Sequence, residues 1–213
     1  MNERVVVVGS GGHAKVLVDI LEQAGGFEIV GFVSIDEHET LYRYPRLGND
    51  EALPDVFRSG VTSAVVAIGE NRRRKLSIHL LRTYGFKLTS AISPAAIISK
   101  WATIGDGAAI LPGAVVNADS RLGDGVIVNT NASIDHDCVV GGCVHIAPGA
   151  SVAGRVRLEE GVLLGIGSSV IPGVTIGAWT LVGAGAAVVS DLPADVVAVG
   201  VPAVVAKVHR RDE

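Results

Sequence analysis

From residue 102 the chain reads ATIGDG, AAILPG, AVVNAD, SRLGDG, VIVNTN and ASIDHD, and this six-residue pattern continues without a slip to Val188. Every sixth residue from Ile104 to Val188 is Ile, Leu or Val. Two residues before each of them stands Ala, Ser, Thr, Cys or Val. A period of six is neither the 3.6 of a helix nor the alternation of a plain sheet. It is typical of a parallel β-helix built from hexapeptides.

The geometry of such a fold explains the two kinds of residue. Each hexapeptide would supply one short strand and one bend, and three hexapeptides would close a triangular coil. The large aliphatic side chain fills the interior, and the small residue stands where the chain bends. Coils stack at about 4.8 Å. The repeat is long enough for roughly five coils, which together bury an apolar core that one coil cannot bury alone.

The first 92 residues carry a different pattern. Apolar runs at 4–9, 28–33, 61–68 and 86–92 alternate with helical spacing at 14–24 and 71–84. Strands that alternate with helices imply a small parallel α/β sheet. The basic run at 72–75 is interpreted as a solvated helix face rather than a phosphate clamp. Ser93-Pro94 marks the boundary, so we expect an α/β domain at 1–92 and a β-helix domain with a C-terminal tail at 93–213.

The loop Gly9-Ser10-Gly11-Gly12-His13 lies between the first strand and the first helix, and it matches a dinucleotide-binding loop in part. Glycines there let backbone N–H groups approach a pyrophosphate at a helix N-terminus. Asp36 follows at about the distance of a ribose-binding acid. A glycine turn without a ligand is the alternative, and His13 either bonds the ligand or only begins the helix. Because the domain is short, a nucleotide diphosphate on a sugar fits it better than a whole nicotinamide dinucleotide.

Titratable residues gather at one place in the repeat, Asp135-His136-Asp137-Cys138, and His145 follows nine residues after His136. Nine residues are half a coil, so these two imidazoles of one chain would lie on different sides of the prism. They would share a site only where two prisms pack side by side, as in a cyclic trimer. A histidine takes a proton near neutral pH, and either neighbouring carboxylate is a candidate to orient it. Two surface histidines are one alternative; an intersubunit zinc site is another, disfavoured because it needs three ligands.

Composition limits the classes of partner. The chain has 213 residues, a formal net charge of −4, 4% aromatic residues and two cysteines. The negative charge argues against nucleic acid and anionic membranes. Cys138 stands at a small inward position, so we interpret it as a core thiol rather than a nucleophile. Neither a secretory signal nor a membrane span is predicted, and we expect a soluble cytoplasmic protein.

Taken together, the motifs resemble the sialic-acid-O-acetyltransferase-type group of hexapeptide-repeat sugar acyltransferases. Within that group they are most similar to the nucleotide-sugar N-acetyltransferases of bacillosamine and perosamine synthesis. The resemblance covers nearly the whole chain and is carried by GSGGHA at 9–14, AIGEN at 67–71, DHDC at 135–138, His145 and GVPA at 200–203. It implies a Rossmann-like parallel sheet followed by a left-handed parallel β-helix.

The resemblance also implies roles for individual residues. The enzyme would be a homotrimer that uses acetyl-CoA and no metal, with His136 as general base and Asp137 raising its basicity. The acetyl-CoA site would include His145, Ile166 and Ala184. The nucleotide-sugar would be held by Gly11, Gly12, His13, Asp36 and Gly69.

The expected reaction is acetylation of the 4-amino group of a nucleotide-linked 4-amino-4,6-dideoxy sugar, such as GDP-perosamine or a UDP-linked amino sugar, for polysaccharide biosynthesis. The amine would attack the thioester directly. A sugar O-acetyltransferase of the same fold and a non-catalytic nucleotide-sugar-binding trimer are the alternatives. The nucleotide and the sugar are left open.

Overall fold

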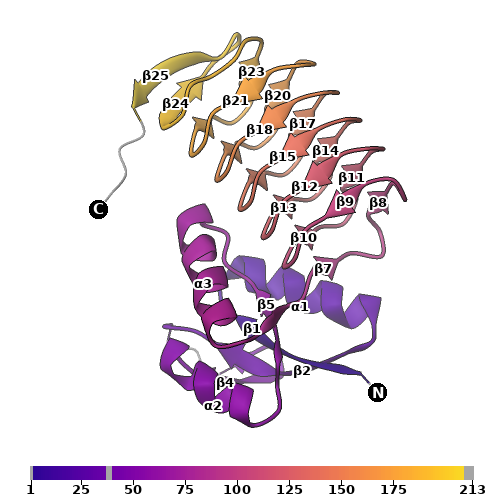
Figure 1. Ribbon diagram of the computed structural model, residues 1–213, viewed down its shortest axis with the longest axis vertical. Helices are drawn as coiled ribbons and strands as arrows, with labels where there is room; N and C mark the ends of the chain where they lie inside the picture. Colours follow the sequence, from indigo (N-terminus) through magenta and orange to yellow (C-terminus); the bar gives the residue numbers. More distant parts are fainter. Residues whose placement is uncertain (1, 37–39, 209–213) are drawn as a thin grey trace. The chain divides into compact units, whose positions relative to one another are not determined.

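The structure is a computed structural model that describes residues 2–36 and 40–208 (Figure 1). The chain forms two compact units, one ending at Pro94 and the other beginning at Ala95. The first unit is an α/β sheet domain, and the second is a left-handed parallel β-helix. Both parts of the predicted fold class are therefore confirmed.

The N-terminal unit is built on a largely parallel sheet whose described strands run in the order β3–β4–β2–β1–β5–β6. Their bounds are β1 Glu3–Val8, β2 Phe27–Val33, β3 Thr40–Leu41, β4 Tyr44–Gly48, β5 Ser63–Val66 and β6 Lys87–Leu88. The central strand β1 pairs in parallel with β2 on one side and β5 on the other. Val5, Val6 and Val7 of this strand are fully buried, because a central parallel strand is covered on both faces.

Helices connect these strands. They are α1 (Gly12–Ala24), the short η1 (Asp50–Ala52), α2 (Leu53–Arg58) and α3 (Asn71–Thr83). Helix α1 buries Ala14, Leu17 and Leu21 at helical spacing. Helix α3 begins where the Glu70 carboxylate accepts hydrogen bonds from two backbone N–H groups of the first turn. The last strand of the unit, β7 (Ala91–Ile92), packs against α1.

The second unit is a three-sided prism in which each hexapeptide contributes one two-residue strand. Face 1 consists of β8 (Ile97–Ile98), β11 (Val115–Val116), β14 (Ser133–Ile134), β17 (Ser151–Val152), β20 (Ser169–Val170) and β23 (Ala187–Val188). Face 2 consists of β9 (Thr103–Ile104), β12 (Arg121–Leu122), β15 (Val139–Val140), β18 (Arg157–Leu158) and β21 (Thr175–Ile176). Face 3 includes β10 (Ala109–Ile110), β13 (Ile127–Val128), β16 (His145–Ile146), β19 (Leu163–Leu164), β22 (Leu181–Val182), β24 (Val196–Val199) and β25 (Val204–Val208).

The repeat of the sequence becomes the register of the coils. From β8 to β20, each strand pairs in parallel with the strand 18 residues further on, as Ile134 does with Val152. The second residue of the strand points inward, and Ile134, Ile146 and Leu164 are fully buried. The small residues face the same interior, among them Ala132, Cys138 and Ala150. The prism core therefore consists of the two residue types that the repeat distinguishes.

The corners of the prism need a left-handed backbone. From Gly107 to Gly185, the residue before each small position has a positive φ, and at most of these corners it is Gly. Asp119, Asn131 and Asp137 take the same conformation, with φ of 60, 56 and 58°. Asp and Asn tolerate it better than other residues with a side chain.

The end of face 3 differs from the rest of the prism. Strand β24 continues the parallel pairing, but β25 returns antiparallel to it. Figure 1 shows this last hairpin beyond the stack of two-residue strands. None of the helices in the described ranges has the length and hydrophobicity needed to span a bilayer.

Candidate functional site

His136 lies at a corner of the prism, where the chain leaves β14 on face 1 and turns toward β15 on face 2. The turn spans residues 135–138, and Asp137 supplies its left-handed position. The side chains of His136 and Asp137 are both about half exposed, at 49% and 55%. The imidazole is therefore held on the outside of the prism, accessible to a substrate.

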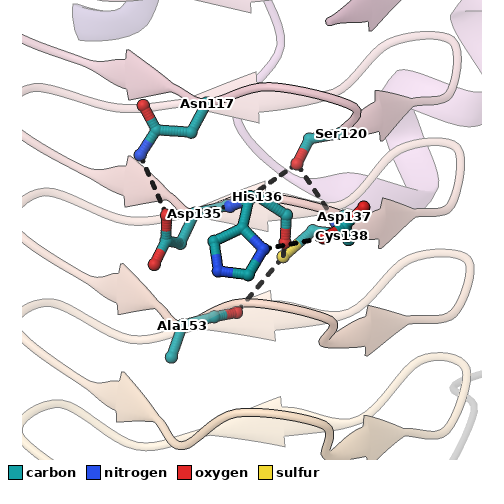
Figure 2. A network of polar contacts seen from close by, with 7 residues as sticks. All are labelled: Asn117, Ser120, Asp135, His136, Asp137, Cys138 and Ala153. Carbon is teal, nitrogen blue, oxygen red and sulfur yellow. Dashed lines mark hydrogen bonds and ion pairs between the residues drawn. The ribbon is translucent and has the colours of Figure 1, made fainter.

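The two acids beside His136 contact different parts of it. His136 Nδ1 lies 2.7 Å from Asp137 Oδ2. The Asp135 carboxylate instead accepts the backbone N–H of His136 at 2.9 Å and the Asn117 amide at 3.0 Å, and Figure 2 shows it turned toward Asn117. The backbone hydrogen bond first, and then the Asn117 amide, lower the pKa of Asp135. Asp137 is thus the acid that contacts the ring.

This contact assigns the two ring nitrogens. With Nδ1–H donating to the Asp137 carboxylate, Nε2 carries the lone pair. Nε2 has no hydrogen-bond partner within the described part of the chain. An imidazole held in this way can accept a proton from a group that approaches from outside the prism.

The corner is fixed from inside by a hydroxyl and a thiol. Ser120 Oγ donates to the Asp135 carbonyl oxygen at 2.6 Å and accepts from the Cys138 backbone N–H at 3.1 Å. The Cys138 thiol donates to the Ala153 carbonyl oxygen at 3.2 Å (Figure 2). Burial raises the pKa of this thiol, so it stays protonated and is a poor nucleophile.

A groove of about 550 Å³, with both polar and apolar lining residues, runs along face 1 beside this corner. Its lining includes Asn117, Asp135 and the outward hydroxyls of Ser133, Ser151 and Ser169. These three serines stand in register on β14, β17 and β20. The groove therefore extends to the corner of His136, because Asp135 both lines the groove and belongs to the turn that carries His136.

The residues expected at the acetyl-CoA site lie elsewhere on the prism. His145 is on β16 of face 3, and its Nε2 is 3.0 Å from the Asn129 side-chain nitrogen. Ile166 and Ala184 are exposed at the corner between face 3 and face 1. They are one coil apart, since the N–H of Gly185 donates to the Ile166 carbonyl oxygen at 2.8 Å. One prism alone does not bring these residues to the corner of His136.

A second candidate site is a pocket of about 840 Å³ in the N-terminal unit. It lies at the carboxyl ends of β1, β2 and β5. The chain adds β2 on one side of β1 and β5 on the other, so the strand order reverses at β1. Ligands of parallel α/β sheets bind at such a reversal point. Its lining contains all five residues expected to hold the nucleotide-sugar, Gly11, Gly12, His13, Asp36 and Gly69.

The three glycines in this set are not required by the backbone conformation or by packing. A Cβ added at Gly11, Gly12 or Gly69 would meet no heavy atom within 4 Å, and none of the three has a positive φ. Gly9 differs, because its φ is 117° and a Cβ would lie 2.6 Å from the Ala67 carbonyl oxygen. Gly9 therefore serves the packing of the loop, whereas the other three leave room in the pocket.

Two polar side chains of this pocket, those of His13 and Asp36, have different surroundings. Burial, and then the charge of Arg74, lower the pKa of His13 to about 4, so its imidazole is neutral at pH 7. Its Nε2 is buried and has no hydrogen-bond partner among the described residues. The Asp36 carboxylate accepts the Ser10 hydroxyl at 3.0 Å, and its backbone N–H donates to Ser34 Oγ at 3.1 Å.

The interpretation of the basic run 72–75 as a solvated face is wrong for Arg74. This side chain is 1% exposed and donates to the carbonyl oxygens of Ile68 and Gly69, at 3.1 and 2.9 Å. It therefore braces the loop that lines the pocket. The helical spacing contained the signal, because Arg74 falls on the same face of α3 as the buried Ile78 and Leu81.

In the described ranges, no group of three or more His, Cys, Asp or Glu side chains is placed to hold a metal ion. The two candidate sites that the structure describes are an imidazole–carboxylate pair on the prism and a glycine-lined pocket in the α/β unit.

The chain is similar to known proteins over both units. The family model described as the PglD N-terminal domain matches residues 4–81. No curated protein matches the chain. Among solved structures, PerB from Caulobacter crescentus, in complex with CoA and GDP-perosamine, is 44% identical; the match covers 94% of this chain and 96% of that one, with a TM-score of 0.92. Two further structures of that perosamine N-acetyltransferase have Asn or Ala in place of one histidine.

Two other structures are similar over nearly their whole length. The acetyltransferase domain of PglB from Neisseria gonorrhoeae, in complex with acetyl coenzyme A, is 35% identical, and the match covers 96% of this chain and 100% of that one with a TM-score of 0.92. WeeI from Acinetobacter baumannii is 24% identical over 94% of this chain and 98% of that one, with a TM-score of 0.81, and supports the fold alone.

Proposed function

The chain belongs to the hexapeptide-repeat nucleotide-sugar N-acetyltransferases, which are acetyl-CoA-dependent acyltransferases, and from this premise we propose its acceptor and its base. The acceptor is the 4-amino group of a nucleotide-linked 4-amino-4,6-dideoxy sugar, with GDP-perosamine as the first candidate. The general base is His136. The observation that carries the proposal is the exposed imidazole whose Nδ1 contacts Asp137 while Nε2 faces no protein partner.

The α/β unit would hold the nucleotide part of the acceptor. Gly11, Gly12 and Gly69 leave space beside the backbone at the N-terminus of α1, where N–H groups and the helix dipole favour a pyrophosphate. Neutral His13 and the Asp36 carboxylate add one imidazole and one acceptor to the same pocket. GDP-perosamine is named because PerB was crystallised with that nucleotide sugar and is similar over nearly the whole chain.

The proposed chemistry is a direct transfer on the prism. The sugar amine attacks the thioester carbonyl carbon, the C–N bond forms, and the C–S bond to coenzyme A then breaks. His136 Nε2 accepts the amine proton, and the Asp137 carboxylate stabilises the imidazolium through Nδ1. The proton then passes to the departing thiolate. No acyl-enzyme is required, which agrees with the buried and protonated Cys138.

A homotrimer would complete the site. His136 lies at the corner of faces 1 and 2, whereas His145, Ile166 and Ala184 lie on face 3 and at its corner with face 1. Parallel prisms around a three-fold axis place one corner of each chain beside a different corner of its neighbour. Acetyl-CoA would then bind between two chains, with His136 from one chain and His145 from the other.

The test is coenzyme A release from acetyl-CoA with a panel of nucleotide-linked 4-amino sugars and their 4-hydroxy counterparts. We expect release with amines, and His136→Ala should lower kcat by about 10²- to 10⁴-fold because a general base is lost. The Kd for the nucleotide sugar and the molecular mass of the assembly should not change.

Each alternative has its own outcome in this experiment. Release with hydroxyl acceptors only would identify an O-acetyltransferase. Tight nucleotide-sugar binding without any release would identify a binding protein. Full turnover by His136→Ala from pH 6 to 9 would remove the base role from His136.

A further inference from the structure

Gly154 lies directly beyond His136 on the same corner of the prism. The two residues are 18 positions apart, which is one coil, and the backbone N–H of Arg155 donates to the His136 carbonyl oxygen at 2.9 Å. The same position in the preceding coil is Ala118, whose carbonyl oxygen accepts from the N–H of Asp137 at 3.1 Å. Along this column of the prism, the imidazole of His136 thus has a residue without a side chain as its next neighbour.

The backbone does not require glycine at this position. Gly154 is not among the corner residues with positive φ, so its conformation is one that alanine adopts. The reason for glycine is the space beside it. A Cβ at Gly154 would lie 2.6 Å from Cε1 and 2.7 Å from Nε2 of His136, and the three nearest heavy atoms all belong to that ring.

We propose that Gly154 is a positioning residue for the reaction, because its bare Cα lets the His136 imidazole lie against the next coil with Nδ1 on Asp137 and Nε2 open to the acceptor. This inference rests on the proposed role of His136 as base. It adds a residue that touches no substrate and acts only through the placement of the ring.

A methyl group at this position should move the ring and leave the coil in place. Both distances are far below van der Waals contact, and the atoms that would be hit lie at the end of a side chain that can rotate. Rotation of the ring lengthens the 2.7 Å contact with Asp137, and a hydrogen bond weakens steeply as its geometry departs from the optimum. The methyl group would also lie beside Nε2, the nitrogen that takes the proton.

The experiment compares Gly154→Ala with Gly142→Ala. Gly142 is also a prism turn residue without positive φ, and a Cβ there meets only the Asp124 carbonyl oxygen at 3.4 Å. We expect Gly154→Ala to lower kcat by about 10- to 100-fold, since small misplacements of a catalytic group have effects of this size. The KM for nucleotide sugar should not change, and the limb of the kcat/KM pH profile that reports the base should move. Gly142→Ala should match the wild-type chain in all three.

A second pair of variants shows whether Gly154 acts through the ring. In a His136→Ala background the ring is absent, so adding Gly154→Ala should change neither kcat nor the unfolding midpoint. If the added methyl lowers kcat or stability equally in both backgrounds, or leaves kcat and the pH profile of the wild-type chain unchanged, the proposal is overturned. If His136→Ala itself keeps full turnover, the base assignment fails, which is a different result from the failure of Gly154.

Discussion

Asp137 combines a backbone role with a side-chain role. Its φ of 58° makes the corner turn, a position that most other corners give to Gly. Its carboxylate lies 2.7 Å from His136 Nδ1. Because Asn also tolerates a left-handed backbone, replacing Asp137 by Asn removes the charge and keeps the turn.

We therefore predict that Asp137→Asn lowers kcat by about 10- to 100-fold. A charge-assisted hydrogen bond to an imidazolium contributes about 1.5–3 kcal/mol, and each 1.4 kcal/mol corresponds to a factor of ten. Without the carboxylate, the imidazolium that forms when His136 accepts the proton loses its charge-assisted hydrogen bond. The rate of coenzyme A release at saturating substrates measures the loss.

Two substitutions serve as controls for Asp137. Asp119 occupies the equivalent corner one coil earlier with φ of 60°, so Asp119→Asn should leave kcat unchanged. Asp135→Asn removes the acid that contacts Asn117 and the backbone of His136 rather than the imidazole ring. If Asp135→Asn proved more harmful to kcat than Asp137→Asn, the ring contact would not be the one that matters.

The buried His13 makes the stability of the folded chain depend on pH. Its pKa is lowered to about 4 in the folded chain, against 6.5 for the unperturbed group. Between these two values the unfolded chain binds a proton that the folded chain does not, so stability falls as the pH drops below 6.5. From pH 7.5 to pH 5 this one group should lower the free energy of unfolding by about 2 kcal/mol.

Urea denaturation at the two pH values tests the prediction for His13. His13→Gln should lose this part of the pH dependence, whereas His79→Asn, at an exposed position on α3, should keep it. An equal pH dependence in the wild-type chain and in His13→Gln would mean that the imidazole of residue 13 is not shielded from water.

Sequence reasoning located these side chains more reliably than it described their contacts. The position of His136 at a corner follows from the hexapeptide phase. Whether Asp135 or Asp137 meets the ring did not follow, because both flank it and only the turn geometry separates them. The role of Gly154 depends on a contact between residues one coil apart, which a single hexapeptide does not reveal.

At the scale of elements, the strands and helices that can be predicted are those with a regular spacing of apolar residues. The repeat assigns each strand of the prism, because one inward residue in six is enough to fix the phase. The segment 40–58 contains β3, β4, η1 and α2, none of which was predicted. These elements are short, and their burial is mixed, so no apolar period develops in them.

Strand β18 provides a matched test of the prism core. Leu158 points inward and is 1% exposed, whereas its neighbour Arg157 points outward. Leu158→Ala should lower the free energy of unfolding by about 2–5 kcal/mol, because it leaves a cavity in a closely packed interior. Arg157→Ala should change it by less than about 0.5 kcal/mol, since its ion pair with Glu159 is long and exposed. Similar losses in the two variants, measured by urea denaturation, would contradict the inward assignment.

At the scale of the whole molecule, the separation of His136 from His145 predicts complementation. If neighbouring chains share a site, a trimer that mixes His136→Ala chains with His145→Ala chains contains some sites with both histidines intact. Random mixing at equal amounts should place both histidines in about a quarter of the sites. Co-refolded mixtures, assayed at limiting acetyl-CoA, should regain that share of wild-type activity.

Each variant refolded alone is the control for complementation. If the mixture is no more active than the separate variants, both histidines of a site must come from the same chain. In the sequence, only the half-coil spacing of the two histidines predicts this arrangement. No motif within one hexapeptide indicates a contact with a neighbouring chain.

The reversed direction of β25 also affects whether prisms of different copies can stack end to end. A prism that ended on a parallel strand would offer its open rim to the first coil of another copy, and such rims favour end-to-end polymerisation. Antiparallel β25 leaves at the rim of face 3 a strand whose direction is opposite to that of the coils. We therefore expect the hairpin to disfavour end-to-end stacking of prisms, because the coils stack by parallel pairing.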